Sequence, residues 1–202
     1  MQIFNLPNSL TLLRILLVPV FTYCFLQGEY RIALIVFVIT GFTDVVDGYL
    51  ARALQKKTTL GAILDPAADK LLMLVTFIVL AMRDLVPPWL SFLVIFRDLV
   101  IVSGTLILKR LKKKLYFKPT RMSKLNTFSQ LFTIFLSFLL TFIRAESPQI
   151  LLPYEGGVAR LLGWVIYICA GMTIITGIQY TRIGLLILRR DREYADLPLK
   201  KD

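Results

Sequence analysis

The sequence between Asp44 and Asp69 reads DVVDGYLARALQKKTTLGAILDPAAD, and it places four carboxylates at the ends of two apolar stretches. Ionisable residues inside an apolar span are costly, so each one requires a physical reason. Asp44 and Asp47 are three residues apart and therefore share one face of a helix. Asp65 and Asp69 are four apart and share a face of the next helix. The short connection makes the two helices antiparallel neighbours, which brings both acidic faces to the same depth.

The composition around this stretch is that of a membrane protein. Of the 202 residues, 56% are hydrophobic, and the mean hydropathy is +0.70. A soluble domain of this length has no interior large enough for so many apolar side chains, so we expect the bilayer to be the solvent. The chain has no histidine, which excludes imidazole-ligated zinc and a histidine general base. Any metal site must therefore be built from oxygen ligands.

Six apolar stretches approach the roughly 20 residues that a membrane helix needs. We predict an all-α integral membrane protein that forms a single domain over residues 1–202, with six transmembrane helices and a short interfacial segment at Met1–Pro7. Turns are indicated by Gly28, by the Pro87-Pro88 pair and by Pro153 with Gly156-Gly157. The predicted spans are about Leu10–Leu26, Arg31–Leu50, Leu60–Ala81, Trp89–Leu108, Leu125–Ile143 and Ala159–Leu186.

The charge distribution predicts an orientation in the membrane. The formal net charge is +11, from 24 Lys+Arg against 13 Asp+Glu. Because the basic residues bracket the apolar stretches, we attribute them to membrane orientation and anionic lipid rather than to nucleic acid. They concentrate after the second and fourth spans and in the tail, which places both termini and the aspartates on the cytoplasmic side. The cluster Lys109–Lys114 has two interpretations. It is either a topology signal that contacts anionic lipid or a site of direct contact with a substrate.

Four converging carboxylates repel one another unless cations compensate their charge. All-oxygen ligation with open positions suits Mg²⁺ or Mn²⁺, which complete their shells with water and substrate phosphate. The alternative is a set of helix-end aspartates paired with basic neighbours such as Arg52 and Lys56. Two same-face pairs in register, with glycines at matching places, favour the metal site.

The spacing D-x2-D-G-x2-A-R-x8-G-x3-D-x3-D, from Asp44 to Asp69, resembles the signature of the CDP-alcohol phosphotransferase family of phospholipid-synthesis enzymes. Six spans and a cytoplasmic amino terminus are also typical of that family. The opening NLPNSLTLLR, at Asn5–Arg14, resembles its glycerophospholipid branch. The resemblance implies that a CDP-linked lipid, usually CDP-diacylglycerol, is the donor and that CMP is released. Homodimers are usual in the family.

The resemblance also implies roles for individual residues of the motif. Asp44, Asp47 and Asp65 resemble the ligands of a pair of metal ions. Asp69 resembles both a metal-site residue and the general base. The positions that resemble the contacts to cytidine diphosphate are Gly48, Ala51, Arg52 and Gly61.

The acceptor side is less defined by the sequence. Arg97 and Asp98 lie deep in the fourth span and point about 100° apart on a helix, so they need not pair with each other. Arg97 either pairs with other helices or lines the acceptor pocket. If the acceptor carries a phosphate, cations near the cytoplasmic side are candidates to bind it. The candidate acceptor-binding residues are Arg97, Arg110, Arg121, Lys124 and Arg182.

The predicted activity is transfer of the phosphatidyl group from CDP-diacylglycerol to glycerol 3-phosphate, giving phosphatidylglycerophosphate and CMP at a bacterial-type inner (plasma) membrane. A cardiolipin synthase, with phosphatidylglycerol as acceptor, is the alternative because Arg97-Asp98 and the SKLNT stretch resemble that group; inositol phosphate is a third acceptor. From another class, a cation or proton transporter would spread its carboxylates along a path, whereas these four gather at one side. A non-enzymatic membrane anchor leaves the aspartates unexplained.

Overall fold

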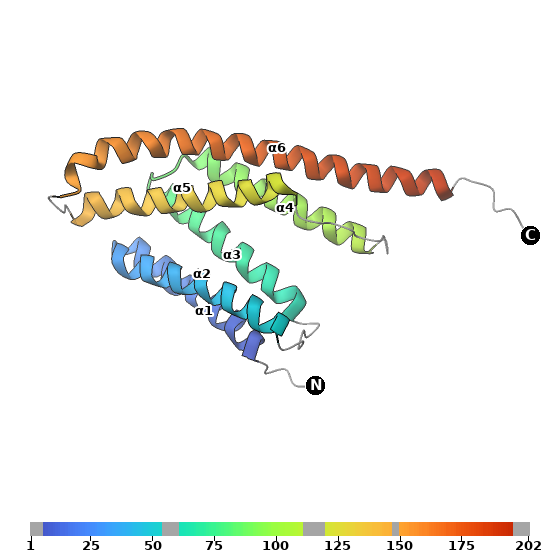
Figure 1. Cartoon of the computed structure of the whole chain (residues 1–202), viewed down its shortest axis with the longest axis horizontal. Helices are drawn as coiled ribbons and strands as arrows, with labels where there is room; N and C mark the ends of the chain where they lie inside the picture. The colour runs from blue at the N-terminus through green and yellow to red at the C-terminus, as the bar shows by residue number, and fades with distance from the viewer. Residues whose placement is uncertain (1–5, 54–60, 111–119, 147–149, 196–202) are drawn as a thin grey trace, which may run out of the picture. The chain divides into compact units, whose positions relative to one another are not determined.

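The computed structural model of the chain describes residues 6–53, 61–110, 120–146 and 150–195, and it contains no strand within them (Figure 1). The segment at residues 1–5, and with it most of the predicted interfacial segment, lies outside the described residues. Six α-helices follow the order and approximate positions of the six predicted spans. They are α1 (Leu6–Leu26), α2 (Tyr30–Ala53), α3 (Gly61–Met82), α4 (Pro88–Arg110), α5 (Arg121–Glu146) and α6 (Glu155–Ala195), with a 3-10 turn, η1 (Leu152–Tyr154), before α6.

Three helices in the described part of the chain are long and apolar enough to cross a membrane. They lie over Pro88–Leu108, Arg121–Ala145 and Leu152–Ile187. The apolar parts of α1, α2 and α3 that the structure describes are shorter, over Ile15–Leu26, Tyr30–Gly41 and Lys70–Met82. Many large apolar side chains on these helices are exposed, as expected where lipid rather than water is the solvent. The chain is therefore a helical membrane protein.

The chain divides into two compact units. Unit 1 comprises Met1–Ser91 and Ile134–Leu162, and unit 2 comprises Phe92–Thr133 and Gly163–Asp202. Within unit 1, α1 packs against α2 and α3, and α2 contacts α3. Because α2 and α3 are joined by a short connection, they run in opposite directions (Figure 1).

The core of unit 1 is aromatic. Phe21 and Phe25 of α1 are fully buried, and the Phe138 ring of α5 lies 6.2 Å and 5.4 Å from their ring centroids. Phe37 of α2 completes the cluster, with its centroid 5.6 Å from that of Phe138. Tilted and edge-on pairs of this kind add about 0.5–1.5 kcal/mol each to the gain from burial. The cluster therefore ties α5 to the α1–α2 pair.

Two helices of unit 1 end in the same motif. After α1, Gly28 adopts φ +86°, its N–H donates to Phe25 O at 3.2 Å, and the Glu29 N–H donates to Cys24 O at 2.9 Å. This is the Schellman arrangement, in which a residue with positive φ terminates a helix. After α3, Asp84 adopts φ 56°, and its backbone N–H donates to Ala81 O at 3.1 Å. Glycine takes this conformation without strain, whereas aspartate does so at a cost.

Replacing Asp84 with glycine is expected to stabilise the protein by about 1 kcal/mol. The change removes the steric cost of a positive φ and takes a negative charge away from the carboxyl end of α3. Asp84→Ala keeps a Cβ in the strained conformation and is the matched control, expected to gain less or to lose stability. Melting temperatures in detergent compare the three proteins, and a glycine variant less stable than the alanine variant would contradict the assignment.

Candidate active site

The acidic motif lies on the adjoining ends of two antiparallel helices of unit 1. At 1.5 Å per residue, Asp47 is about 9 Å from the last residue of α2 and Asp65 about 6 Å from the first residue of α3. Asp44 and Asp69 lie one turn deeper, about 13 Å from the same ends. The backbone thus arranges the four positions in two levels, each with one aspartate from either helix.

The side chains of this motif lie outside the described part of the structure, although their helices are described. This applies to the predicted metal ligands and to the predicted contacts with cytidine diphosphate, and their roles stay predictions. The positions concerned are Asp44, Asp47, Asp65, Asp69, Gly48, Ala51, Arg52 and Gly61.

Unit 2 contains a buried polar cluster centred on Arg97 of α4. Its side chain is 6% exposed, and its Nη1 lies 2.6 Å from Asp98 Oδ1. Its Nε donates to Thr176 Oγ1 at 3.3 Å, and its Nη2 lies 3.5 Å from Ser123 Oγ. The guanidinium carbon also lies 5.7 Å from the ring centroid of Tyr180. Every nitrogen of Arg97 therefore has a protein partner, so the arginine joins α4 to α5 and α6.

Two amide side chains continue this polar cluster along α5. Asn126 is fully buried and Gln130 is 2% exposed, and their spacing places both on one face of the helix. Thr173 Oγ1 donates to Asn126 Oδ1 at 3.0 Å. Among the described residues, Asn126 Nδ2 and Gln130 Nε2 have no hydrogen-bond partner. An unsatisfied buried donor costs about 1–3 kcal/mol, so these two nitrogens mark places where water or a polar ligand would be stabilised.

The beginning of α5 gathers exposed cations. Thr120 caps the helix, since its hydroxyl accepts a hydrogen bond from the Ser123 backbone N–H at 3.2 Å. Arg121 and Lys124 in the first turn are exposed, and so is Arg182 of α6. Cations beside the positive end of a helix dipole favour an anion. The fifth acceptor candidate, Arg110, is the last residue of α4, and its side chain lies outside the described part.

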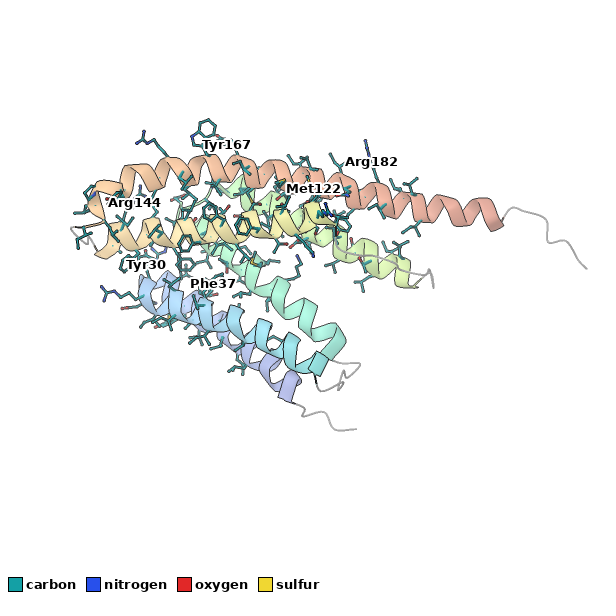
Figure 2. The ribbon with its side chains drawn as sticks, viewed as in Figure 1. Tyr30, Phe37, Met122, Arg144, Tyr167 and Arg182 are labelled. Atoms are coloured by element: carbon teal, nitrogen blue, oxygen red, sulfur yellow. The ribbon has the colours of Figure 1, made fainter. Side chains whose placement is uncertain are left out.

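Two grooves of unit 2 adjoin these polar groups. The groove between α5 and α6, with an empty volume of about 900 Å³, is lined by Met122, Ile175, Ile178, Gln179, Arg182 and Ile183; Figure 2 labels Met122 and Arg182. The groove between α4 and α6 is almost wholly apolar, with an empty volume of about 620 Å³, and includes Gly104, Tyr180 and Gly184. The first groove therefore combines an apolar wall with one cation.

Three residues of this cluster were not predicted from the sequence: Thr173, Thr176 and Tyr180. Their three- and four-residue spacing places them on one face of α6, and this polar stripe in an otherwise apolar helix was a usable signal. The same spacing recurs in Asn126 and Gln130 on α5.

Comparison with known proteins gives a consistent family. The family model described as CDP-alcohol phosphatidyltransferase matches residues 4–175, which span both units. A CDP-diacylglycerol--glycerol-3-phosphate 3-phosphatidyltransferase of Cereibacter sphaeroides is 30% identical, over 94% of this chain and 99% of that protein.

Other relatives are considerably longer than this chain. A cardiolipin synthase (CMP-forming) / mitochondrial hydrolase fusion protein of Schizosaccharomyces pombe is 36% identical over 89% of the chain, which spans 31% of that protein. The human cardiolipin synthase (CMP-forming) is 35% identical over 65% of the chain and 49% of that protein. The chain thus spans only a third to a half of these two relatives. Since the family model covers most of the sequence, including the whole aspartate motif, the chain belongs to the CDP-alcohol phosphatidyltransferase family.

Proposed function

We propose that the protein transfers the phosphatidyl group of CDP-diacylglycerol to glycerol 3-phosphate, giving phosphatidylglycerophosphate and CMP. The observation that carries this proposal is the acidic motif, whose four positions form two levels on antiparallel helices. The relative from Cereibacter sphaeroides, which bears the name of this activity, supports it because the two chains align along nearly their whole lengths.

We assign two divalent ions, Mg²⁺ or Mn²⁺, to the four aspartates. The donor set fits these ions because it consists of carboxylate oxygens with positions left for water and substrate phosphate. When bound, the ions neutralise the diphosphate and stabilise the oxygen of the leaving CMP. The proposed contacts to the cytidine diphosphate group are Gly48, Ala51, Arg52 and Gly61.

Asp69 is the proposed general base. Its carboxylate takes the proton from the acceptor hydroxyl as the oxygen of that hydroxyl bonds to the phosphorus attached to diacylglycerol. The bond from this phosphorus to the CMP oxygen breaks, and CMP leaves with the electron pair.

The acceptor phosphate is proposed to bind at the beginning of α5. Lys124 and Arg121 are exposed in its first turn, where the helix dipole adds to their charge. Arg182 and Arg110 are the further cations of this site. Arg97 is given a positioning role, because its nitrogens are already engaged by Asp98, Thr176 and Ser123.

Phosphatidylglycerol is the second candidate acceptor, which would make the protein a cardiolipin synthase. The groove between α5 and α6 favours it, because isoleucines line the wall and Arg182 provides a cation at the same groove. A lipid acceptor needs such an apolar channel, whereas glycerol 3-phosphate needs only cations and hydrogen-bond donors. The cardiolipin synthases among the relatives support this candidate.

The proposed setting is the inner (plasma) membrane, which all six helices cross. The loops after the second and fourth helices and the tail are rich in Lys and Arg, which supports cytoplasmic termini and a cytoplasmic active site. A homodimer is proposed as the assembly.

Asp65→Asn is expected to abolish metal-dependent release of CMP from CDP-diacylglycerol. The substitution removes a charged ligand while keeping the side-chain size. Asp84→Asn, a change to an exposed carboxylate outside the motif, is the control and should leave the activity unchanged. Purified protein is incubated with CDP-diacylglycerol, Mn²⁺ and acceptor, and CMP is measured. Full activity in EDTA, or in Asp65→Asn, would exclude the proposed mechanism.

Lys124→Ala and Arg110→Ala are expected to raise the KM for glycerol 3-phosphate about tenfold or more, because each removes a charge-assisted hydrogen bond to the phosphate. Arg160→Ala removes an exposed cation at the other end of α6 and serves as control. Lipid products formed with glycerol 3-phosphate and with phosphatidylglycerol are analysed in parallel. Unchanged KM values in both alanine variants would show that the acceptor phosphate binds elsewhere.

Arg97→Lys is expected to destabilise unit 2 by about 2–3 kcal/mol. Lysine keeps the charge but lacks the planar fork that reaches several partners at once, and the buried partners would lose their hydrogen bonds. Arg121→Lys, at an exposed position, should leave the melting temperature unchanged. A normal melting temperature together with a raised KM would place Arg97 in the acceptor pocket instead.

A further inference from the structure

An open polar pocket lies at the end of unit 1 opposite the aspartate motif. It has an empty volume of about 640 Å³ and is lined by Tyr30, Arg83, Leu85, Thr141, Arg144 and Ala145. Tyr30 begins α2 and Arg83 follows α3, whereas the aspartates lie toward the other ends of these helices. At 1.5 Å per residue, the pocket is about 20 Å from Asp44 along α2 and from Asp69 along α3.

Several contacts hold the segments that form this pocket. Arg83 and Leu85 flank Asp84 in one Schellman turn, and Tyr30 follows the other turn, at Gly28. The Arg83 side chain donates to the carbonyl oxygen of Leu26 and so joins the end of α3 to the end of α1. The Tyr30 ring lies edge-on to Phe25, with centroids 5.3 Å apart. These contacts preorganise the lining groups, which lowers the entropy that a ligand must lose.

The charge of the pocket is positive. Its lining contains two guanidinium groups and no carboxylate among the described residues. Arg144 Nε donates to Glu155 Oε1 at 2.9 Å, which leaves the two terminal nitrogens of the guanidinium for another acceptor. Among the described residues Arg83 forms no ion pair. Glu155 compensates one of the two cations, so the positive charge of the lining comes from Arg83. Glu29 and Asp84 are exposed and do not line the pocket, and the side chain of Glu146 lies outside the described part.

A phenol completes the set of donors, and Tyr30 contributes it. The buried Thr141 adds no donor, because its single O–H already donates to Ser137 O at 2.8 Å. Guanidinium and hydroxyl donors that converge from separate segments match the oxygens of a phosphate group.

Exposed aromatic residues indicate that the pocket lies at the level of a membrane surface. Trp89 and Tyr154 are exposed at the same helix ends of unit 1, and Figure 2 labels Tyr30 and Arg144 there. Tryptophan and tyrosine favour the headgroup region of a bilayer. Exposed apolar side chains, including Met82 and Leu152, lie at the same helix ends. They offer an apolar surface that the acyl chains of a lipid can contact.

From these observations we infer that the pocket binds the phosphate of an anionic phospholipid in the leaflet opposite the aspartate motif. Arg83 and Arg144 bind the phosphate oxygens, Tyr30 donates a hydrogen bond, and the acyl chains lie along the exposed apolar helix surface. The distance along α2 and α3 separates this lipid from the donor and acceptor of the transferase reaction. The inference does not rest on the proposed transferase activity.

Native mass spectrometry of the full-length protein in detergent tests the site. Phosphatidylglycerol and zwitterionic phosphatidylcholine are added at equal concentrations, with EDTA present so that metal-held lipid does not contribute. Wild-type protein is expected to retain phosphatidylglycerol in preference. Arg83→Gln and Arg144→Gln should each bind it about tenfold more weakly, since each loses a charge-assisted contact.

Two matched controls separate this site from general charge effects. Arg160→Gln removes an exposed cation outside the pocket and should not change lipid binding. Glu155→Gln breaks the same ion pair as Arg144→Gln but keeps the cation in the pocket, so it should bind phosphatidylglycerol equally or more tightly. Melting temperatures identify a variant that misfolds. Arg83→Gln is the variant at risk, because Arg83 also bonds to Leu26; if it misfolds, the lipid binding of Arg144→Gln decides the test.

Inorganic phosphate distinguishes a lipid site from a site for free phosphate. Equal phosphatidylglycerol binding in wild type, Arg83→Gln and Arg144→Gln would overturn the inference. The inference would also be overturned if inorganic phosphate stabilised the protein through both arginines while phosphatidylglycerol binding did not depend on them. Loss of CMP release with lipid binding intact would affect only the proposed function.

Discussion

A polar group that enters an apolar helix bundle must find a partner inside the protein, because the surrounding lipid offers none. The buried threonines meet this constraint locally: Thr76 and Thr133 donate to carbonyl oxygens one turn earlier in their own helices. Arg97 meets it through tertiary contacts and so fixes the register of three helices in unit 2. Carboxylates cannot donate to one another when ionised, so the same constraint is the reason for proposing that cations compensate the four aspartates. Arg97 thus satisfies the constraint within the protein, whereas metal ions are the proposed answer at the acidic motif.

The helices were predictable from the sequence because apolar length and turn residues are local signals. As expected, Gly28 marks the end of α1 and the Pro87-Pro88 pair marks the beginning of α4. Pro153 lies in the predicted turn, whereas Gly156 and Gly157 lie inside the first turn of α6. The family was likewise predictable, since the motif from Asp44 to Asp69 is contiguous. That α1, α2 and α3 cross the membrane stays a prediction. The apolar parts of these helices that the structure describes are shorter than a membrane span.

Contacts between distant segments were not predictable. Asp98 is the sequence neighbour of Arg97 and points along a different radial direction, yet the flexible arginine stem brings the two groups within 2.6 Å. Whether Arg97 met other helices or a substrate depended on Ser123 and Thr176, which lie far away in sequence. In the sequence, Arg83 stands beside Asp84, and Arg144 is followed by Glu146. In the fold, Arg83 after α3 and Arg144 in the last turn of α5 line one pocket, whereas Asp84 and Glu29 stay outside it.

The length of α6 has a mechanical consequence. Its 41 residues extend about 60 Å, roughly twice the hydrocarbon thickness of a bilayer. The apolar part ends at Ile187, and the following turns of the helix carry Arg189, Arg190 and Arg192 in their sequence. Because Arg97 holds α6 in register with α4 and α5, the surplus length extends past the hydrocarbon at this end of the helix. The same rigid element therefore serves both as a membrane span and as a basic arm at the level of the lipid headgroups.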